Sequence, residues 1–155
     1  MTHRQWIATA GFLWFLIGVL LTLKGIYWMG EAIESTNSLS FRYQETFGTV
    51  HQTATVFTSI ALLIGWAKGR FVLFKTVRRV AQRILALQPP IALTQAFSKS
   101  YWFLIGGMMA LGMGMKAISM PEDVRGCIDL AVGTALLQGS LYYFRMAKAT
   151  LNLSQ

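Results

Sequence analysis

Residues 101–120 read YWFLIGGMMALGMGMKAISM, a run of apolar and small residues in which Lys116 is the only charge. A helix rises 1.5 Å per residue, so about 20 such residues span the ~30 Å hydrocarbon core of a bilayer. Three further apolar stretches occur at about 6–29, 49–67 and 127–146. We therefore predict an all-α, polytopic membrane protein in which residues 1–155 form one domain with four transmembrane helices.

The composition favours lipid over water as the surroundings of this chain. Of its 155 residues, 54% are hydrophobic and 13% are charged, whereas soluble domains contain about 25% charged residues. The length leaves no room for a separate soluble enzyme domain. The stretch at 6–29 is longer than the apolar part of a signal peptide and no A-x-A-like site follows it, so we expect it to be retained.

Basic residues gather on one side of the predicted spans. Ten of the 14 lie at the N-terminus, between the second and third spans, or at and after the end of the fourth: Arg4, Lys68, Arg70, Lys75, Arg78, Arg79, Arg83, Lys99, Arg145 and Lys148. The opposite loops contain Arg42 and Arg125 against five acidic residues. Because basic loops stay in the cytoplasm, we predict a multi-pass inner-membrane protein with its N- and C-termini cytoplasmic.

Residues 70–88 predict a basic amphipathic helix that ends at Pro89-Pro90. Its apolar face holds Leu73, Val77, Val80, Ala81, Ile84 and Leu87. We expect this helix to lie at the membrane surface, with anionic lipid headgroups of the cytoplasmic leaflet bound by Lys75, Arg78, Arg79 and Arg83. A nucleic acid or an acidic partner is the alternative for such a face; our prediction is lipid, with no nucleic acid.

The run KGRFVLxK at 68–75, followed by RRxxxRI at 78–84, resembles small, uncharacterised bacterial four-helix membrane proteins. The resemblance covers a limited part of the chain and implies no activity.

Small residues at helical spacing predict close contacts between helices. In the first span they recur every seven residues, at Gly11, Gly18 and Gly25. In the third and fourth spans they form stripes spaced by four residues, at Gly106, Ala110 and Gly114 and at Ala131, Ala135 and Gly139. The third and fourth spans are joined by a short turn, so we expect antiparallel neighbours whose stripes face each other.

Two short matches are consistent with an internal duplication. WFLIG occurs at 14–18 and 102–106, and ALLxG at 61–65 and 135–139. The four spans would then be two αα-hairpins forming a parallel repeat about an axis along the membrane normal. Matches of this length also arise by chance in an apolar chain, so both interpretations stay open.

Three charged residues interrupt the predicted spans: Lys24, Lys116 and Asp129. A charge at the centre of a span costs about 2.5–3.5 kcal/mol on insertion scales. Each of the three lies roughly one to one and a half helical turns inside the outer boundary, so they can meet at one level. We expect Asp129 to pair with Lys116, which leaves Lys24 for Glu31, Glu34 or a ligand.

Two interpretations of these charges stay open. The lysines can extend to the outer surface along their own stems, with Asp129 neutralising one of them. Alternatively, the three residues line an outward-facing polar pocket that binds an anion or a small substrate. The polar first half of the second span adds His51 as a further candidate ligand-binding residue, or simply as a helix-start residue that faces headgroups or the external loop.

Metal and catalytic sites have little support in the sequence. Thioethers suit Cu(I), and the third span is rich in methionine: Met108, Met109, Met113, Met115 and Met120. Methionine is also a flexible packing residue, and no Cys or His accompanies these at helical spacing, so we predict no metal and no cofactor. No phosphate loop, CxxC, HExxH or GxSxG motif occurs, although His51 with Gln52 could in principle serve a membrane enzyme.

Two functions are compatible with these patterns. The small-residue seams and the lack of catalytic groups favour a non-enzymatic structural or accessory subunit that forms homo-oligomers or docks in a membrane complex. The charged residues Lys24, Lys116 and Asp129 favour a small oligomeric transporter or channel with an outward-facing anion site. A continuous polar cavity would support the second function, and a dry, packed centre would support the first.

Overall fold

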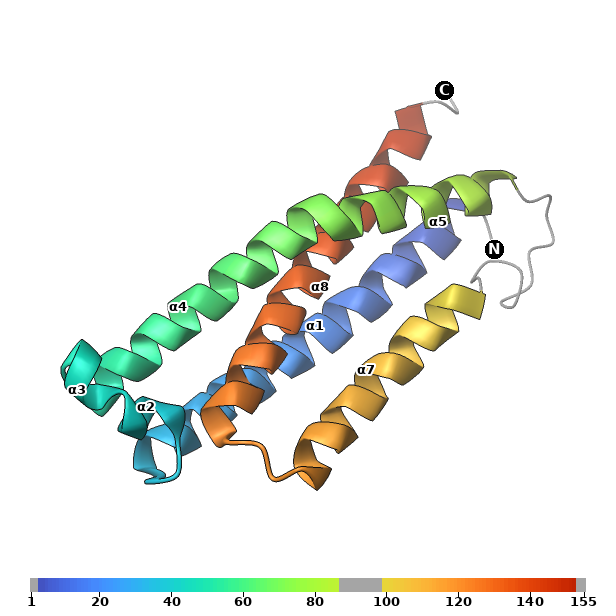
Figure 1. Cartoon of the computed structure of the whole chain (residues 1–155). Helices are drawn as coiled ribbons and strands as arrows, with labels where there is room; N and C mark the ends of the chain where they lie inside the picture. Colours follow the sequence, from blue (N-terminus) through green and yellow to red (C-terminus); the bar gives the residue numbers. More distant parts are fainter. Residues whose placement is uncertain (1–2, 87–98, 153–155) are drawn as a thin grey trace.

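The computed structural model describes residues 3–86 and 99–152, and every element within these ranges is a helix (Figure 1). The long helices are α1 (His3–Glu34), α4 (Val50–Lys68), α7 (Lys99–Ala117) and α8 (Glu122–Asn152). A π-helical turn, η1 (Gly69–Leu73), joins α4 to α5 (Phe74–Ala86). Two short helices, α2 (Leu39–Arg42) and α3 (Gln44–Phe47), lie between α1 and α4. The all-α prediction is confirmed.

Two helices in the described ranges are long and apolar enough to cross a membrane: α1 and the continuous helix Val50–Ala86. Only 33% and 17% of the residues in their most apolar segments are buried. Large apolar side chains such as Leu20, Leu23 and Leu63 are instead exposed. These two helices meet the length and composition requirements for a membrane-spanning helix. The prediction of four spans goes beyond this finding.

The most extensive packing among the described residues joins α1 to α8, which run antiparallel. The seam formed by Gly11, Gly18 and Gly25 lies against α8, where Gly126 and Gly133 repeat the same spacing of seven residues. A Cβ atom added to Gly25 would lie 2.8 Å from the backbone nitrogen of Leu130. The two backbones approach this closely because no side chain stands between them.

A second glycine seam holds α4 against α8. Gly65 lies against the backbone of Ala131, and a Cβ atom on Gly69 would lie 3.1 Å from the Cα atom of Ala135. Gly65 and Gly69 are four residues apart, the spacing that brings two small residues onto one helix face. The stripe of α8 therefore faces α4, with Gly139 against the ring of Trp14 on α1.

The expected contact between the stripes of α7 and α8 is wrong. α7 does run antiparallel to α8 after a short turn (Figure 1). However, a Cβ atom added to Gly106 or Gly114 would meet nothing within 4 Å, and Ala110 is exposed. The physical reason is that α4 and α1 already occupy the small-residue surface of α8.

The packing does not repeat across the matched sequence pairs. Gly18 ends the first WFLIG match, and a Cβ atom added to it would lie 3.1 Å from the carbonyl oxygen of Gly133, whereas Gly106 ends the second and faces open space. Gly65 lies against Ala131, whereas its counterpart Gly139 lies against Trp14. Equivalent residues of the two hairpins therefore have different neighbours, and the duplication gains no support from the fold.

The predicted basic helix corresponds to η1 and α5, but its apolar face packs on protein. Val77, Val80, Ala81 and Ile84 are buried in one cluster with residues of α1 and α8, among them Trp6, Ile7 and Tyr143. A π-helical turn holds more residues than an α-helical turn, so η1 changes the angular position of the α5 residues relative to those of α4. The basic side chains Lys75, Arg78, Arg79 and Arg83 are exposed on the other side. Leu87 and Pro89-Pro90 lie outside the described residues.

At the opposite end of the bundle, Asp123 ties the 35–48 connection to α8. Its side chain is fully buried and accepts hydrogen bonds from the backbone nitrogen of Ser40 at 2.7 Å and from the Ser40 hydroxyl at 3.2 Å. Thr49 and Gln52 then form a capping box that starts α4. These contacts set the position of α2 against the start of α8.

Candidate functional site

A pocket of about 280 Å³ with four charged residues in its lining, called the polar pocket below, lies between α1, α7 and α8, at the end of the bundle near the α7–α8 turn. The residues that line it are Lys24, Trp28, Gly112, Met115, Lys116, Arg125 and Asp129. The structure thus brings together the three charged residues that interrupt the predicted spans. That these three residues bind a ligand stays a prediction.

Asp129 pairs with Lys24 rather than with Lys116. The Lys24 Nζ atom lies 3.1 Å from Asp129 Oδ2, and the two side chains are 47% and 6% exposed. The contact is an ion pair without hydrogen-bond geometry, since Oδ2 has no hydrogen-bond partner among the described residues. The expected Asp129–Lys116 pair is wrong because the glycine seam brings α1 close to α8, whereas α7 stands further off.

Arg125 is a fourth charged residue of the pocket, and sequence reasoning placed it in an outer loop. Its Nη2 atom donates a hydrogen bond to the carbonyl oxygen of Met115 at 3.3 Å. Its guanidinium carbon lies 5.2 Å from the centroid of the Trp28 ring, within the range of a cation–π contact. Its Nε atom is buried and has no hydrogen-bond partner among the described residues.

A spacing signal could have found Arg125 and Trp28. Arg125 and Asp129 are four residues apart on α8, and Lys24 and Trp28 are four residues apart on α1. Residues at this spacing share a helix face, so Trp28 lies on the same face as Lys24, and Arg125 lies on the same face as Asp129. Together Lys24, Lys116 and Arg125 give the pocket three cations against the one carboxylate of Asp129.

His51 does not belong to this pocket. It lies exposed in the first turn of α4, where its carbonyl oxygen accepts a hydrogen bond from the Thr55 hydroxyl. The methionines of α7 also diverge: Met115 lines the polar pocket, Met108 lines a separate groove, and Met113 is exposed. These three thioethers do not point to one centre.

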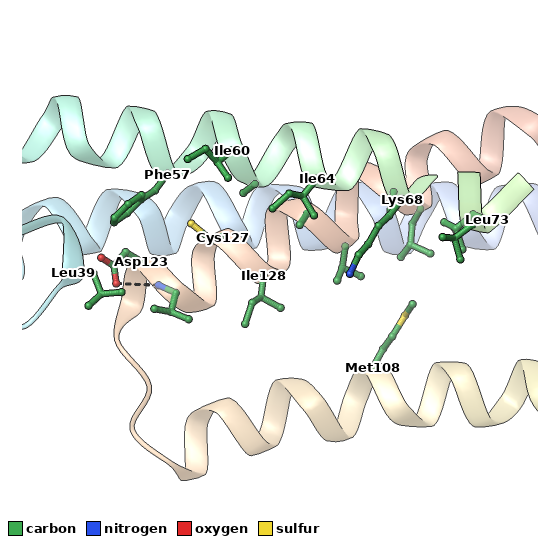
Figure 2. Close-up of a pocket in the computed structure, with 17 residues that line it drawn as sticks. Leu39, Phe57, Ile60, Ile64, Lys68, Leu73, Met108, Asp123, Cys127 and Ile128 are labelled. Carbon is green, nitrogen blue, oxygen red and sulfur yellow. Dashed lines mark hydrogen bonds between the residues drawn. The ribbon is translucent and has the colours of Figure 1, made fainter. Parts of the chain in front are cut away.

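The separate groove is apolar and has a volume of about 570 Å³. It lies between α4 and α8, with Met108 of α7 on its open side (Figure 2). Apolar side chains of α4 and α8 form most of the lining, including Phe57, Ile60, Ile64, Ile128 and Leu136. Leu39 and Asp123 lie at one end, and Lys68 lies towards the other (Figure 2).

Comparison of the chain with protein-family models, with curated proteins and with solved structures found no match in any of the three.

Proposed function

We propose that this chain is an inner-membrane protein with four spans and both termini in the cytoplasm. The exposed apolar side chains on α1, α4 and α7, among them Leu20, Leu63 and Met113, support a lipid surrounding, because soluble monomers rarely expose large contiguous apolar patches. The start of α1, the basic helix α5 and the end of α8 lie at one end of the bundle, opposite α2 and α3 (Figure 1). The predicted inner segments, which hold most of the basic residues, therefore lie at one end of the bundle and the predicted outer loops at the other.

Cysteine labelling in intact cells tests this orientation. In a Cys127→Ala background, Thr36→Cys and Arg79→Cys place single thiols at exposed positions on the two opposite ends. We expect a membrane-impermeant maleimide to label position 36 in intact cells and position 79 only after permeabilisation. Labelling of position 79 alone in intact cells would reverse the orientation, and equal labelling of both would contradict a spanning protein.

Within the membrane, we propose a non-enzymatic subunit that associates with another helix through α7. One observation carries this: a Cβ atom on Gly106, Gly107, Gly112 or Gly114 would meet nothing within 4 Å, whereas all of Gly11, Gly18, Gly25, Gly65 and Gly69 lie against a neighbouring helix. Glycines within the long helices thus mark helix contacts, except on α7 and at Gly30 near the end of α1. Close backbone approach by a helix of a second copy would complete that pattern.

Disulfide cross-linking at Ala110 tests the association. Ala110 is exposed between Gly106 and Gly114, so Ala110→Cys in the Cys127→Ala background should form a covalent dimer when membranes are oxidised. Leu20→Cys is the control, since Leu20 is also exposed but lies on α1 and near the middle of its predicted span. Dimers at both positions would indicate random collision, and dimers at neither would remove the proposed α7 contact between copies.

The polar pocket favours a second candidate, an oligomeric transporter or channel that binds anions. The support is the excess of cations, with Lys24, Lys116 and Arg125 around Asp129, together with the buried Arg125 Nε atom that has no hydrogen-bond partner among the described residues. Buried polar groups normally have partners, and an anion would supply one. Four spans rarely enclose a pathway alone, so transport would need several copies.

A further inference from the structure

We propose that the groove between α4 and α8 binds one acyl chain of an anionic phospholipid, whose phosphate is held by Lys68. This inference rests on the proposed position of the chain in the membrane. It concerns a different site from the polar pocket and from the small-residue face of α7.

The composition of the groove fits a hydrocarbon chain. Its lining is almost wholly apolar, and the two charged residues in it are Asp123 and Lys68. Asp123 is buried and already accepts hydrogen bonds from Ser40. Lys68 is exposed, and Figure 2 shows its side chain reaching from α4 into the groove. The groove therefore offers an apolar channel with one available cation, among the residues that line it, at the end that we place in the cytoplasm.

The length of the groove fits an acyl chain. On α4 it extends from Phe57 to Lys68, a rise of about 17 Å, close to the ~15 Å of one leaflet. An acyl chain that follows α4 over this length stays within one leaflet.

The charge of the headgroup follows from the position of Lys68. This lysine lies at the end of α4, next to the π-turn that leads into the exposed basic face of α5. Basic residues beside a span attract anionic lipid of the cytoplasmic leaflet. A phosphate at Lys68 would place its acyl chain along Ile64, Ile60 and Phe57, in the direction of the outer leaflet.

Native mass spectrometry of the full chain in mild detergent tests the proposal with phosphatidylglycerol and, as the zwitterionic comparison, phosphatidylcholine of the same chain length. We expect one retained phosphatidylglycerol. Ile64→Trp fills the groove and should lower its lipid occupancy about tenfold. Lys68→Gln should remove the preference for phosphatidylglycerol over phosphatidylcholine, because the headgroup loses its charged contact. Leu63→Trp and Lys148→Gln are matched controls: Leu63 and Lys148 are exposed, and neither lines the groove.

A second measurement needs no space-filling variant. Cys127 is the only cysteine, lines the groove and is partly buried. Added phosphatidylglycerol should slow its reaction with a maleimide in the native sequence, and Lys68→Gln should abolish this protection. Equal lipid retention in Ile64→Trp and Leu63→Trp, or a reaction rate at Cys127 that lipid does not alter, would overturn the proposal. If position 36 is labelled in intact cells but the protein retains no lipid, the groove proposal fails and the proposed membrane orientation stands.

Discussion

Gly25→Leu is expected to prevent α1 from packing on α8 and to lower the free energy of unfolding by about 3 kcal/mol or more, the upper range for overpacking. A Cβ atom at this position would lie 2.8 Å from the Leu130 backbone nitrogen and 3.0 Å from the Gly126 carbonyl oxygen. Backbone atoms cannot rotate away as a side chain can, so the helices must separate. Thermal unfolding in detergent, followed by the reaction of Cys127 with a thiol-specific fluorophore, measures the loss.

Gly30→Leu is the matched control on the same helix. A Cβ atom on Gly30 would meet nothing within 4 Å, and a surface substitution of this kind changes stability by about 0.5 kcal/mol or less. Equal losses in the two variants would show that α1 and α8 are not joined through this seam.

Lys24→Met is expected to destabilise the protein more than Asp129→Asn, although both variants break the same ion pair. The Asp129 side chain is 6% exposed, so removal of Lys24 leaves a buried charge without its partner. Breaking a fully buried pair in this way costs about 3–5 kcal/mol; because the Lys24 side chain is 47% exposed, we expect about 1–3 kcal/mol. Asp129→Asn leaves a lysine that can still reach water, so its effect should stay near 1 kcal/mol or less.

The double variant completes the cycle. Lys24→Met with Asp129→Asn should be about as stable as Asp129→Asn alone, because a neutral amide at position 129 no longer needs Lys24. Unfolding temperatures of the four proteins in one detergent measure this. Additive losses would mean that the 3.1 Å contact contributes nothing to stability.

Lys116→Met separates the anion-site candidate from a purely structural pair. Lys116 is exposed and lines the pocket outside the Lys24–Asp129 ion pair, so this variant should fold normally. A bound anion raises the unfolding temperature with its concentration. A rise with phosphate in the native sequence that is lost in Lys116→Met would support the pocket as a site, and an equal rise in both would be a general salt effect.

Much of the candidate site could be anticipated from the sequence, but its pairing could not. Counting turns from the span ends placed Lys24, Lys116 and Asp129 at one level, and one pocket contains all three. The partner of Asp129 depends on which helix lies closest to α8, and that distance is set by Gly18, Gly25, Gly126 and Gly133. Arg125 falls in a loop of the four-span prediction because the predicted span begins at residue 127, whereas α8 begins at Glu122.

The sequence by itself determined that the chain is helical and, within a few residues, where most of its long helices lie, because apolar run length, turn residues and charges act locally along the chain. Only the tertiary structure decided which helices meet. All four predicted spans are apolar, so apolarity alone favours no pair of them over another. The choice depends on steric fit between residues far apart in sequence: Gly25 against Gly126, Gly65 against Ala131, and Val77 against the ends of α1 and α8.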